Sequence, residues 1–372
     1  MTAPDVVIVG GGPAGSAAAI RLARAGARVT LIERMATAHH KVCGEFVSAG
    51  ALRQLHALGV DAALLTSVPI RTVRLLRGAQ MAEVGLPFPA CSLSRRQLDW
   101  HLLELAAVQG VEIRRGVTAR RADSSFGIQV QLSDGSCITA GALFLATGKH
   151  DLRGWPRGTG IQNRLIGLKM HLALAPAAAA MLAGAVELLF FDGGYAGLQL
   201  VGDAKANLCL LVAKEKYESL GRSWQRLLAM LDAESPLWGE RLAGARPCWK
   251  QPLSIYGLPY GYVAEPEAGP VFRLGDQLAV VPSFAGDGMA MALTSGRQAA
   301  KTFIADGADA LGYHQRMARR FGRRVRGSAW ASRLLEQPAL QAIAVEAAAQ
   351  APALLAWAAE ATRIGDREQS AA

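Results

Sequence analysis

Residues 5 to 34 read DVVIVGGGPAGSAAAIRLARAGARVTLIER, and this stretch decides the fold of the chain. An apolar run, Val6 to Val9, leads into a glycine-rich turn. A stretch of small residues with helical spacing follows, and then a second apolar run that closes on Glu33. This order of strand, glycine turn, helix, strand and acid is typical of a βαβ unit that binds a dinucleotide. Taken alone, the motif fits FAD and NAD(P) equally well.

Each part of the motif has a physical role. Gly10 makes the tight turn, Gly12 lets the backbone approach a pyrophosphate, and Gly15 lets the helix pack close to the sheet. The helix that starts after the turn offers free N–H groups and the positive end of its dipole to the phosphates. Glu33 can accept hydrogen bonds from an adenosine ribose.

Composition places the chain among globular proteins. It has 372 residues, of which 51% are apolar and 19% charged, so we expect two or three lobes and no extended disorder. Its five cysteines show no CxxC spacing and no cluster with histidine, which favours reduced thiols and predicts no metal site. The N-terminus lacks a basic segment before its apolar run, so we predict no signal peptide and a cytoplasmic protein.

Two segments raise the question of a membrane. Residues 172–191 are nearly all apolar apart from Glu187, and we predict a short helix followed by a strand from Val186 to Phe191 rather than a membrane span. The net charge is +10, and residues 315–326, QRMARRFGRRVR, hold six arginines. A solvated helix face is the default interpretation. The alternatives are contact with an anionic membrane surface, a CoA-like substrate or an acidic carrier protein through Arg316 to Arg326. No stacking-aromatic pattern indicates nucleic acid.

Distant segments complete the first unit. Residues 93–148 predict a helix, a strand from Val111, a hairpin that turns at Asp134-Gly135, and an apolar strand that ends before Gly148. Residues 271–300 predict a strand, Gly275-Asp276, a loop with Pro282 and a helix that opens at about Gly288. Between them, residues 157–268 alternate in short runs typical of antiparallel strands, and residues 73–86 indicate another hairpin. The chain after Asp306 is alanine-rich and helical in pattern.

These motifs together resemble the FAD-dependent oxidoreductases of the para-hydroxybenzoate hydroxylase and geranylgeranyl reductase superfamily. The resemblance rests on GGGPAG with Glu33-Arg34, on the Leu145 to Gly148 segment, and on the segment from Gly275 to Ala300. It implies an α/β (α+β) fold: a glutathione-reductase-like, three-layer FAD-binding Rossmann domain, an antiparallel-sheet substrate domain and a helical C-terminus. The implied boundaries are 1–70, 92–155 and 270–305 for the FAD domain, 71–91 and 156–269 for the substrate domain, and 306–372 for the helical region.

The same resemblance implies FAD as the cofactor and assigns its contacts. Glu33 would hold the adenosine ribose with Arg34 near the adenine, whose edge Val117 would touch. Arg95 would lie near the ribityl or phosphate region, and Asp276 would bind the ribityl chain and the pyrophosphate end. The full set of cofactor candidates is Gly10, Gly12, Pro13, Ala14, Gly15, Glu33, Arg34, Lys41, Arg95, Val117, Gly148, Asp276, Gly286, Gly288 and Met289.

The sequence departs from the family pattern in two places. Thr147 stands where the family usually has Asp, and residues 277–281 replace the usual sequence after Gly-Asp. Both departures favour the reductase-like branch over the aromatic hydroxylases, and the Trp-rich signature of flavin halogenases is absent. The loop Lys41 to Phe46 resembles a family loop that runs beside the isoalloxazine ring, so Cys43 is a candidate for a redox role, although a lone cysteine is more often inert packing.

On the substrate side the pocket candidates are Cys43, Lys169, His171 and Tyr195, and Phe191 and Gln199 of the intervening sheet are further candidates. Lys169 and His171 alternate along one strand, so their side chains should share a face. We expect this face to be exposed to solvent. The many apolar side chains favour a hydrophobic substrate.

Against these two departures, the resemblance to the broader superfamily leads us to expect a flavoprotein monooxygenase that acts on a hydrophobic aromatic, polyketide-like or isoprenoid molecule. A geranylgeranyl-reductase-like C=C reductase and a quinone-linked electron relay are the alternatives. With no second glycine fingerprint in the chain, NAD(P)H is the expected transient electron donor. Besides a cytoplasmic location, peripheral contact with the inner membrane surface is an option.

Overall fold

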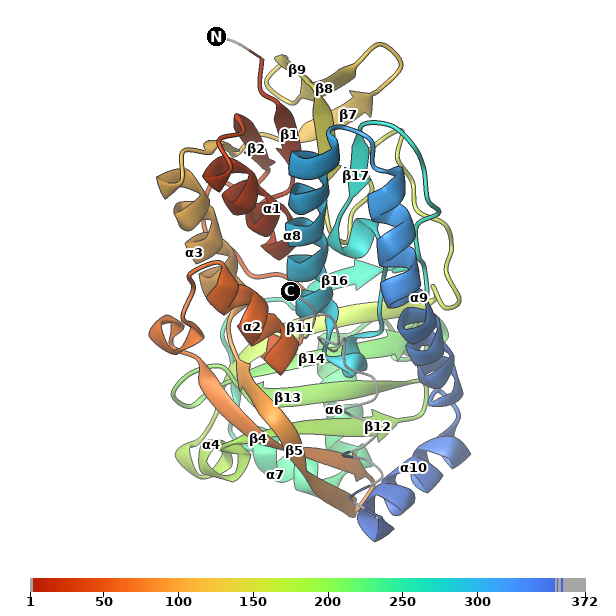
Figure 1. Cartoon of the computed structure of the whole chain (residues 1–372). Helices are drawn as coiled ribbons and strands as arrows, with labels where there is room; N and C mark the ends of the chain where they lie inside the picture. Colours follow the sequence, from red (N-terminus) through yellow and green to blue (C-terminus); the bar gives the residue numbers. More distant parts are fainter. Residues whose placement is uncertain (1–2, 352, 354–355, 357–372) are drawn as a thin grey trace.

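The computed structural model describes residues 3–351, 353 and 356 (Figure 1). The βαβ unit lies at the centre of a five-stranded parallel sheet. Its strand order is β17 (Val271–Arg273), β10 (Ala142–Leu145), β1 (Val6–Val9), β2 (Val29–Glu33) and β6 (Glu112–Arg115). Parallel neighbours need crossovers. Here one neighbour of β10 comes from more than 120 residues further along the chain.

The parallel sheet forms the middle of three layers. The side chains of β1 alternate: Val6 and Ile8 face α1 (Pro13–Arg24), α3 (Arg95–Val108) and α8 (Gly288–Asp306). Val7 and Val9 face a small antiparallel sheet of β7 (Ala119–Asp123), β8 (Ile128–Leu132) and β9 (Cys137–Ala140). A strand buried on both faces reads as a continuous apolar run, as the sequence of β1 does.

The larger sheet has nine strands (Figure 1). Their order is β15 (Arg246–Pro247), β11 (Leu165–Ala173), β14 (Lys205–Ala213), β13 (Gly194–Leu200), β12 (Ala185–Phe191), β4 (Val68–Arg77), β5 (Gln80–Ser92) and β3 (Phe46–Val47), with β16 (Leu253–Tyr256) paired to β11. All pairs are antiparallel except β12 with β4. Because β4 and β12 are far apart in the chain, a long crossover permits this one parallel pair.

Helices cover one face of the larger sheet. Its apolar side chains pack against α4 (Pro176–Leu182), α6 (Trp224–Glu234) and α7 (Pro236–Leu242). The short helix and strand predicted within residues 172–191 are therefore confirmed as α4 and β12. Among the described residues, no helix is both long and apolar enough to cross a bilayer.

The remaining helices connect or flank the two sheets. They are α2 (Ala49–Ala57), α5 (Lys214–Ser219), α9 (Leu311–Leu334) and α10 (Pro338–Gln350), with 3-10 turns at η1 (Ala62–Leu65), η2 (Gly275–Gln277) and η3 (Ser283–Ala285). Helix α9 runs beside α8 and continues past the larger sheet to α10 (Figure 1). The helical pattern predicted after Asp306 is confirmed up to α10, and most of the chain beyond it lies outside the described residues. The domain boundaries stay a prediction.

Candidate functional site

A cavity of about 470 Å³ lies where the two sheets meet. Its wall contains the glycine turn after β1, the loop of residues 41–46, the segment 146–152, strand β16 with the residues that follow it, and the N-terminus of α8. A volume of this size is typical of small-molecule and cofactor sites. All the predicted cofactor residues except Gly15 line this cavity, which brings together segments from both ends of the chain.

The glycine turn shows which glycines the fold needs and which leave room for a ligand. A Cβ on Gly15 would lie 2.0 Å from the carbonyl oxygen of Gly10, and a Cβ on Gly10 would lie 2.3 Å from that of Ala146. These two glycines permit close backbone packing. A Cβ on Gly12 would meet nothing nearer than Arg95 Nη2 at 3.6 Å and Lys41 Nζ at 3.9 Å. The backbone at Gly12 is therefore open toward the cavity, between two cations.

These two cations share one buried carboxylate. Asp99 Oδ1 accepts a hydrogen bond from Arg95 Nε at 2.6 Å, and Asp99 Oδ2 lies 3.0 Å from Lys41 Nζ. Burial raises the pKa of Asp99, but Arg95 and Lys41 outweigh it and hold this pKa at about 2. With two cations and one anion, the cluster keeps a net positive charge beside the amides at the start of α1. This charge fits the diphosphate of a dinucleotide.

Glu33 lies at the far side of the turn. Its Oε2 accepts a hydrogen bond from the amide of Gly11 at 2.9 Å and its Oε1 accepts one from the amide of Met35 at 3.0 Å. The carboxylate is thus fixed in orientation at the cavity wall. Since a carboxylate has about four lone-pair sites, it can accept further hydrogen bonds from ribose hydroxyls, as the sequence predicts.

The segment that begins at residue 275, far from the glycine turn in the sequence, forms another part of the cavity wall. The amide of Gly275, whose φ is +56°, donates to Ser295 Oγ at 2.9 Å, and Asp276 lines the cavity in the next position. The fully buried Gln277 donates from Nε2 to the carbonyls of Gly148 at 2.8 Å and His150 at 3.0 Å. This side chain joins two motifs that lie far apart in the sequence. Helix α8 then points its N-terminus, and so its positive dipole end, at the cavity.

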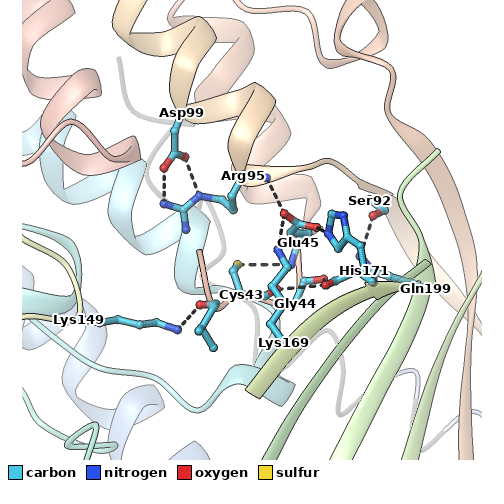
Figure 2. A network of polar contacts seen from close by, with 12 residues as sticks. Cys43, Gly44, Glu45, Ser92, Arg95, Asp99, Lys149, Lys169, His171 and Gln199 are labelled. Atoms are coloured by element: carbon cyan, nitrogen blue, oxygen red, sulfur yellow. Dashed lines mark hydrogen bonds and ion pairs between the residues drawn. The ribbon is translucent and has the colours of Figure 1, made fainter. Parts of the chain in front are cut away.

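A buried ionic cluster between the loop of residues 41–46 and strand β11 fixes the position of the loop (Figure 2). Glu45, whose side chain is fully buried, lies 2.6 Å from Lys169 Nζ and 2.7 Å from His171 Nε2, and it accepts a hydrogen bond from the amide of Arg95 at 2.8 Å. Burial raises the pKa of Glu45, but His171 and Lys169 outweigh it and lower this pKa to about 2. Glu45 is therefore an anion that ties the loop to β11 and to the start of α3.

Asparagine and lysine contacts fix the same loop along its backbone. Asn207 Nδ2 donates to the carbonyls of Gly44 at 2.8 Å and Cys43 at 3.1 Å, and Lys149 Nζ donates to the carbonyl of Val42. Glu45 itself has a φ of +59°, a conformation that is unusual for a residue other than glycine. The loop keeps this conformation because contacts on several sides hold it, and Cys43 is presented at the cavity wall.

His40, Glu45 and His171 also have the composition of a metal site, since their ligand atoms lie within 4.8 Å of one another. Lys169 occupies the same carboxylate, however, and already supplies the positive charge that a metal ion would bring. Burial, with His171 and Lys169, lowers the pKa of His40 to about 4, so this ring is neutral at physiological pH. We interpret the group as an ionic and aromatic cluster in which Trp249 packs against both rings.

The structure corrects the expected environment of Lys169 and His171. Both side chains do share a face of β11, and both are buried rather than exposed to solvent. The loop with Glu45 covers this face, so neither residue reaches the cavity. Tyr195 is also absent from the cavity wall, and its ring packs at 6.2 Å from that of Phe284. Phe191 and Gln199 do not line the cavity either, so Cys43 is the one pocket candidate that does.

Three residues of the site escaped the sequence prediction: Asp99, Gln277 and Glu45. Asp99 had a local signal, because its spacing of four residues from Arg95 on one helix favours an ion pair. Gln277 falls in the segment that departs from the family pattern. Glu45 had no signal, since its partners on β11 are 124 and 126 residues away.

Comparison with known proteins identifies the site. Residues 3–137 match the model of the FAD binding domain. The chain is 30% identical over 329 residues to the menaquinone reductase of Mycolicibacterium smegmatis, covering 82% of this chain and 78% of the relative. The chain belongs to the FAD-dependent oxidoreductases of the para-hydroxybenzoate hydroxylase and geranylgeranyl reductase superfamily. FAD is therefore its cofactor.

Two further relatives of this FAD-dependent oxidoreductase differ in coverage. Digeranylgeranylglycerophospholipid reductase 2 of Methanopyrus kandleri is 27% identical and covers 79% of this chain and 75% of its own length. The 3-amino-4-hydroxybenzoate 2-monooxygenase PtmB3 of Streptomyces platensis is 30% identical but covers only 44% of this chain and 42% of its own length.

Solved structures share the fold of the oxidoreductase. The myxobacterial chondrochloren halogenase CndH has a TM-score of 0.77 at 18% identity and covers 91% of this chain and 84% of its own. A geranylgeranyl bacteriochlorophyll reductase-like protein from Thermoplasma acidophilum has a TM-score of 0.71 at 18% identity, covering 91% of this chain and 88% of its own. At such low identity the likeness establishes the architecture, and the predicted fold class is confirmed.

Proposed function

We propose that this oxidoreductase reduces a carbon–carbon double bond in a polyprenyl lipid. The observation that carries the proposal is the extent of the match to relatives named menaquinone reductase and digeranylgeranylglycerophospholipid reductase, which spans about four fifths of the chain. Both names denote molecules that carry isoprenoid chains. The monooxygenase PtmB3 matches less than half of the chain. We therefore place reduction ahead of the hydroxylation that the resemblance to the broader superfamily first favoured.

The wall of the cavity supports an apolar substrate. Apolar and aromatic residues in this wall include Leu253, Ile255, Leu258, Tyr260, Val280, Val281 and Pro282. Burying such apolar surface against a hydrocarbon chain favours binding of the chain by about 25 cal/mol per Å² buried. Charged residues also line the cavity, among them Lys41 and Arg95 beside the glycine turn, where the cofactor is expected.

The reaction adds two hydrogen atoms to the double bond. FAD, when bound and reduced, supplies the hydride, and a proton must reach the second carbon. Cys43 lies in the cavity wall with its backbone fixed by Asn207, so it is a candidate for a group that meets the substrate. NAD(P)H, as a transient donor, is part of the proposal.

Product analysis tests the proposal. The protein is reduced without oxygen and mixed with menaquinone or with a geranylgeranyl lipid, and the product is examined by mass spectrometry and NMR. We expect a gain of two hydrogen atoms in the isoprenoid chain. A product changed only at the quinone ring supports the electron relay instead. A product that gains an oxygen atom, and forms only in air, supports the monooxygenase. Either result would overturn the assignment as a double-bond reductase.

A further inference from the structure

Helix α9 presents a continuous basic face. Its 24 residues contain seven arginines and no acid. Arg316, Arg319, Arg323 and Arg326 recur every three or four positions and are all exposed, so they form one stripe along the helix, the basic stripe. The opposite side of the helix, with Met317, Phe321 and Val325, packs into the protein core.

The charge of the basic stripe is not neutralised within the described part of the chain. Across residues 3–351 no ion pair joins Arg319, Arg323 or Arg326 to an acid, and Arg316 donates only to the hydroxyl of Thr302 at 2.6 Å. Four cations on one face without a counterion favour an anionic partner. Simple solvation of the helix face therefore does not explain why these arginines lie together.

The stripe continues into apolar residues at the C-terminal end of the helix. Trp330 and Leu334 follow Arg326 with the same spacing, and 53% and 51% of their surfaces are exposed. The guanidinium of Arg333 lies 5.6 Å from the centre of the Trp330 ring. A face that combines arginines with exposed Trp and Leu is typical of helices that lie on a membrane surface, where Trp favours the interface. An acidic protein partner would explain the arginines but not the exposed apolar end.

The apolar end lies close to the substrate side of the cavity. Ser332 and Leu335, on the inner side of the same turn, line a small void together with Tyr195 and Phe284. Ser283, the residue before Phe284, belongs to the wall of the main cavity, and so does Tyr260, whose hydroxyl is 3.4 Å from Ser283 Oγ. The void beside the C-terminal end of α9 therefore adjoins the wall of the main cavity.

We propose that α9 docks this protein on an anionic lipid bilayer, with the basic stripe against the headgroups and with Trp330 and Leu334 inserted at the interface. The inference rests on the proposed function, because a polyprenyl substrate resides in the bilayer. Docking in this orientation brings the small void lined by Phe284 and Leu335, which adjoins the main cavity, toward the membrane that holds the apolar chain of the substrate.

Vesicle binding tests the docking. The FAD-loaded protein is floated with vesicles of phosphatidylcholine alone and with vesicles that also contain phosphatidylglycerol. We expect binding to the anionic vesicles and its decrease as salt is added. In the variant Arg319→Gln/Arg323→Gln/Arg326→Gln, partition should fall on the order of 100-fold, since each arginine near the surface contributes about 1 kcal/mol. Trp330→Ala/Leu334→Ala should lose roughly tenfold or more.

A matched variant controls for net charge. Arg21→Gln/Arg120→Gln/Arg226→Gln removes three exposed arginines from α1, β7 and α6 and should bind almost as well as the wild type. Equal loss in both triple variants would show a general charge effect and overturn the docking face. Absence of binding to anionic vesicles, or binding to an acidic carrier protein in its place, would also overturn it.

The two proposals fail separately. Reductase activity is measured with the substrate in detergent micelles, where docking on a bilayer is not needed. If the stripe variant keeps this activity and loses activity only with substrate in anionic vesicles, both proposals stand. Activity in micelles without any vesicle binding removes the docking proposal alone. Vesicle binding without a reduced product removes the proposed function alone.

Discussion

Glu45 Oε2 lies 2.7 Å from Nε2 of His171, so a residue of the loop at the cavity is fixed by a strand of the larger sheet. Lys169 on the same strand lies at the other oxygen of this carboxylate. The conformation of the loop therefore depends on the relative position of the two sheets. A substitution on β11 can therefore alter the cavity through the carboxylate of Glu45, although no side chain of β11 lines the cavity.

Removing the charge of Glu45 should destabilise the protein strongly. Glu45→Gln leaves the ammonium of Lys169 buried without a counterion, and breaking a buried pair in this way costs about 3 to 5 kcal/mol. The free energy of unfolding is measured by urea titration. Glu218→Gln, in an exposed pair with Arg222, is the control and should change it little. The double variant Glu45→Gln/Lys169→Met should recover part of the loss, and a loss that persists in full would contradict the ionic explanation.

His40 should make stability depend on pH. Burial, with His171 and Lys169, lowers its pKa from 6.5 to about 4. Between these values the unfolded chain binds a proton on His40 that the folded protein does not, so stability falls as the pH drops from 6.5 toward 4. His40→Phe keeps a ring beside Trp249 and should reduce this slope. Other histidines with lowered pKa contribute too, so the difference between the two unfolding curves is the quantity to compare, and identical slopes would refute the prediction.

The contribution of Glu45 belongs to a lower pH range. Its folded-state pKa is about 2 against an ordinary 4.5, so its stabilisation is fully present above 4.5 and is lost as the pH falls toward 2. The free energy of unfolding of Glu45→Gln, measured as a function of pH, should therefore depart from that of the wild type below pH 4.5. Above pH 4.5 the two curves should run parallel.

Gly12→Ala and Gly15→Ala should separate cofactor binding from folding. A Cβ at position 12 meets no atom nearer than 3.6 Å, so Gly12→Ala should fold with nearly unchanged stability and lose FAD because the methyl group occupies the cavity wall. A Cβ at position 15 would lie 2.0 Å from a backbone oxygen, so Gly15→Ala should lose about 1 to 3 kcal/mol of stability. Thermal unfolding of the apoproteins and flavin absorbance after gel filtration measure the two effects. Similar stability in both variants would contradict the packing argument.

Arg95 should contribute to FAD affinity through its charge. In Arg95→Gln the cluster with Asp99 and Lys41 loses its net positive charge, and a lost charged hydrogen bond to phosphate is worth about 1.5 to 3 kcal/mol. The Kd for FAD should therefore rise about 10- to 100-fold, measured by fluorescence titration of the apoprotein. Arg96→Gln, the exposed neighbour on α3, is the control. Equal affinity in the two variants would exclude Arg95 from the cofactor site.

The sequence predicts those parts of the fold and the site that depend on local patterns. The glycine turn, the strands beside it and the start of α8 at Gly288 are visible because turn chemistry and apolar periodicity act within a few residues. The environments of Lys169 and His171 could not be predicted in this way. Their burial depends on which loop covers β11, and that loop is fixed by Glu45 and Asn207 through pairings that span more than 120 residues.

The positions of strand β17 and helix α8 in the sequence also determine the order in which parts of the protein can fold during synthesis. The parallel sheet that carries the glycine turn gains its last strand only from residues 271–273. Gly296 of α8 then packs so closely on α1 that a Cβ there would lie 2.1 Å from the carbonyl oxygen of Ala14. During synthesis the first half of the chain leaves the ribosome long before these residues exist. FAD capture must then be a late event of folding. A fragment that ends before residue 271 should therefore lack the cofactor, and the growing chain should depend on chaperones until residues 271–300 have been made.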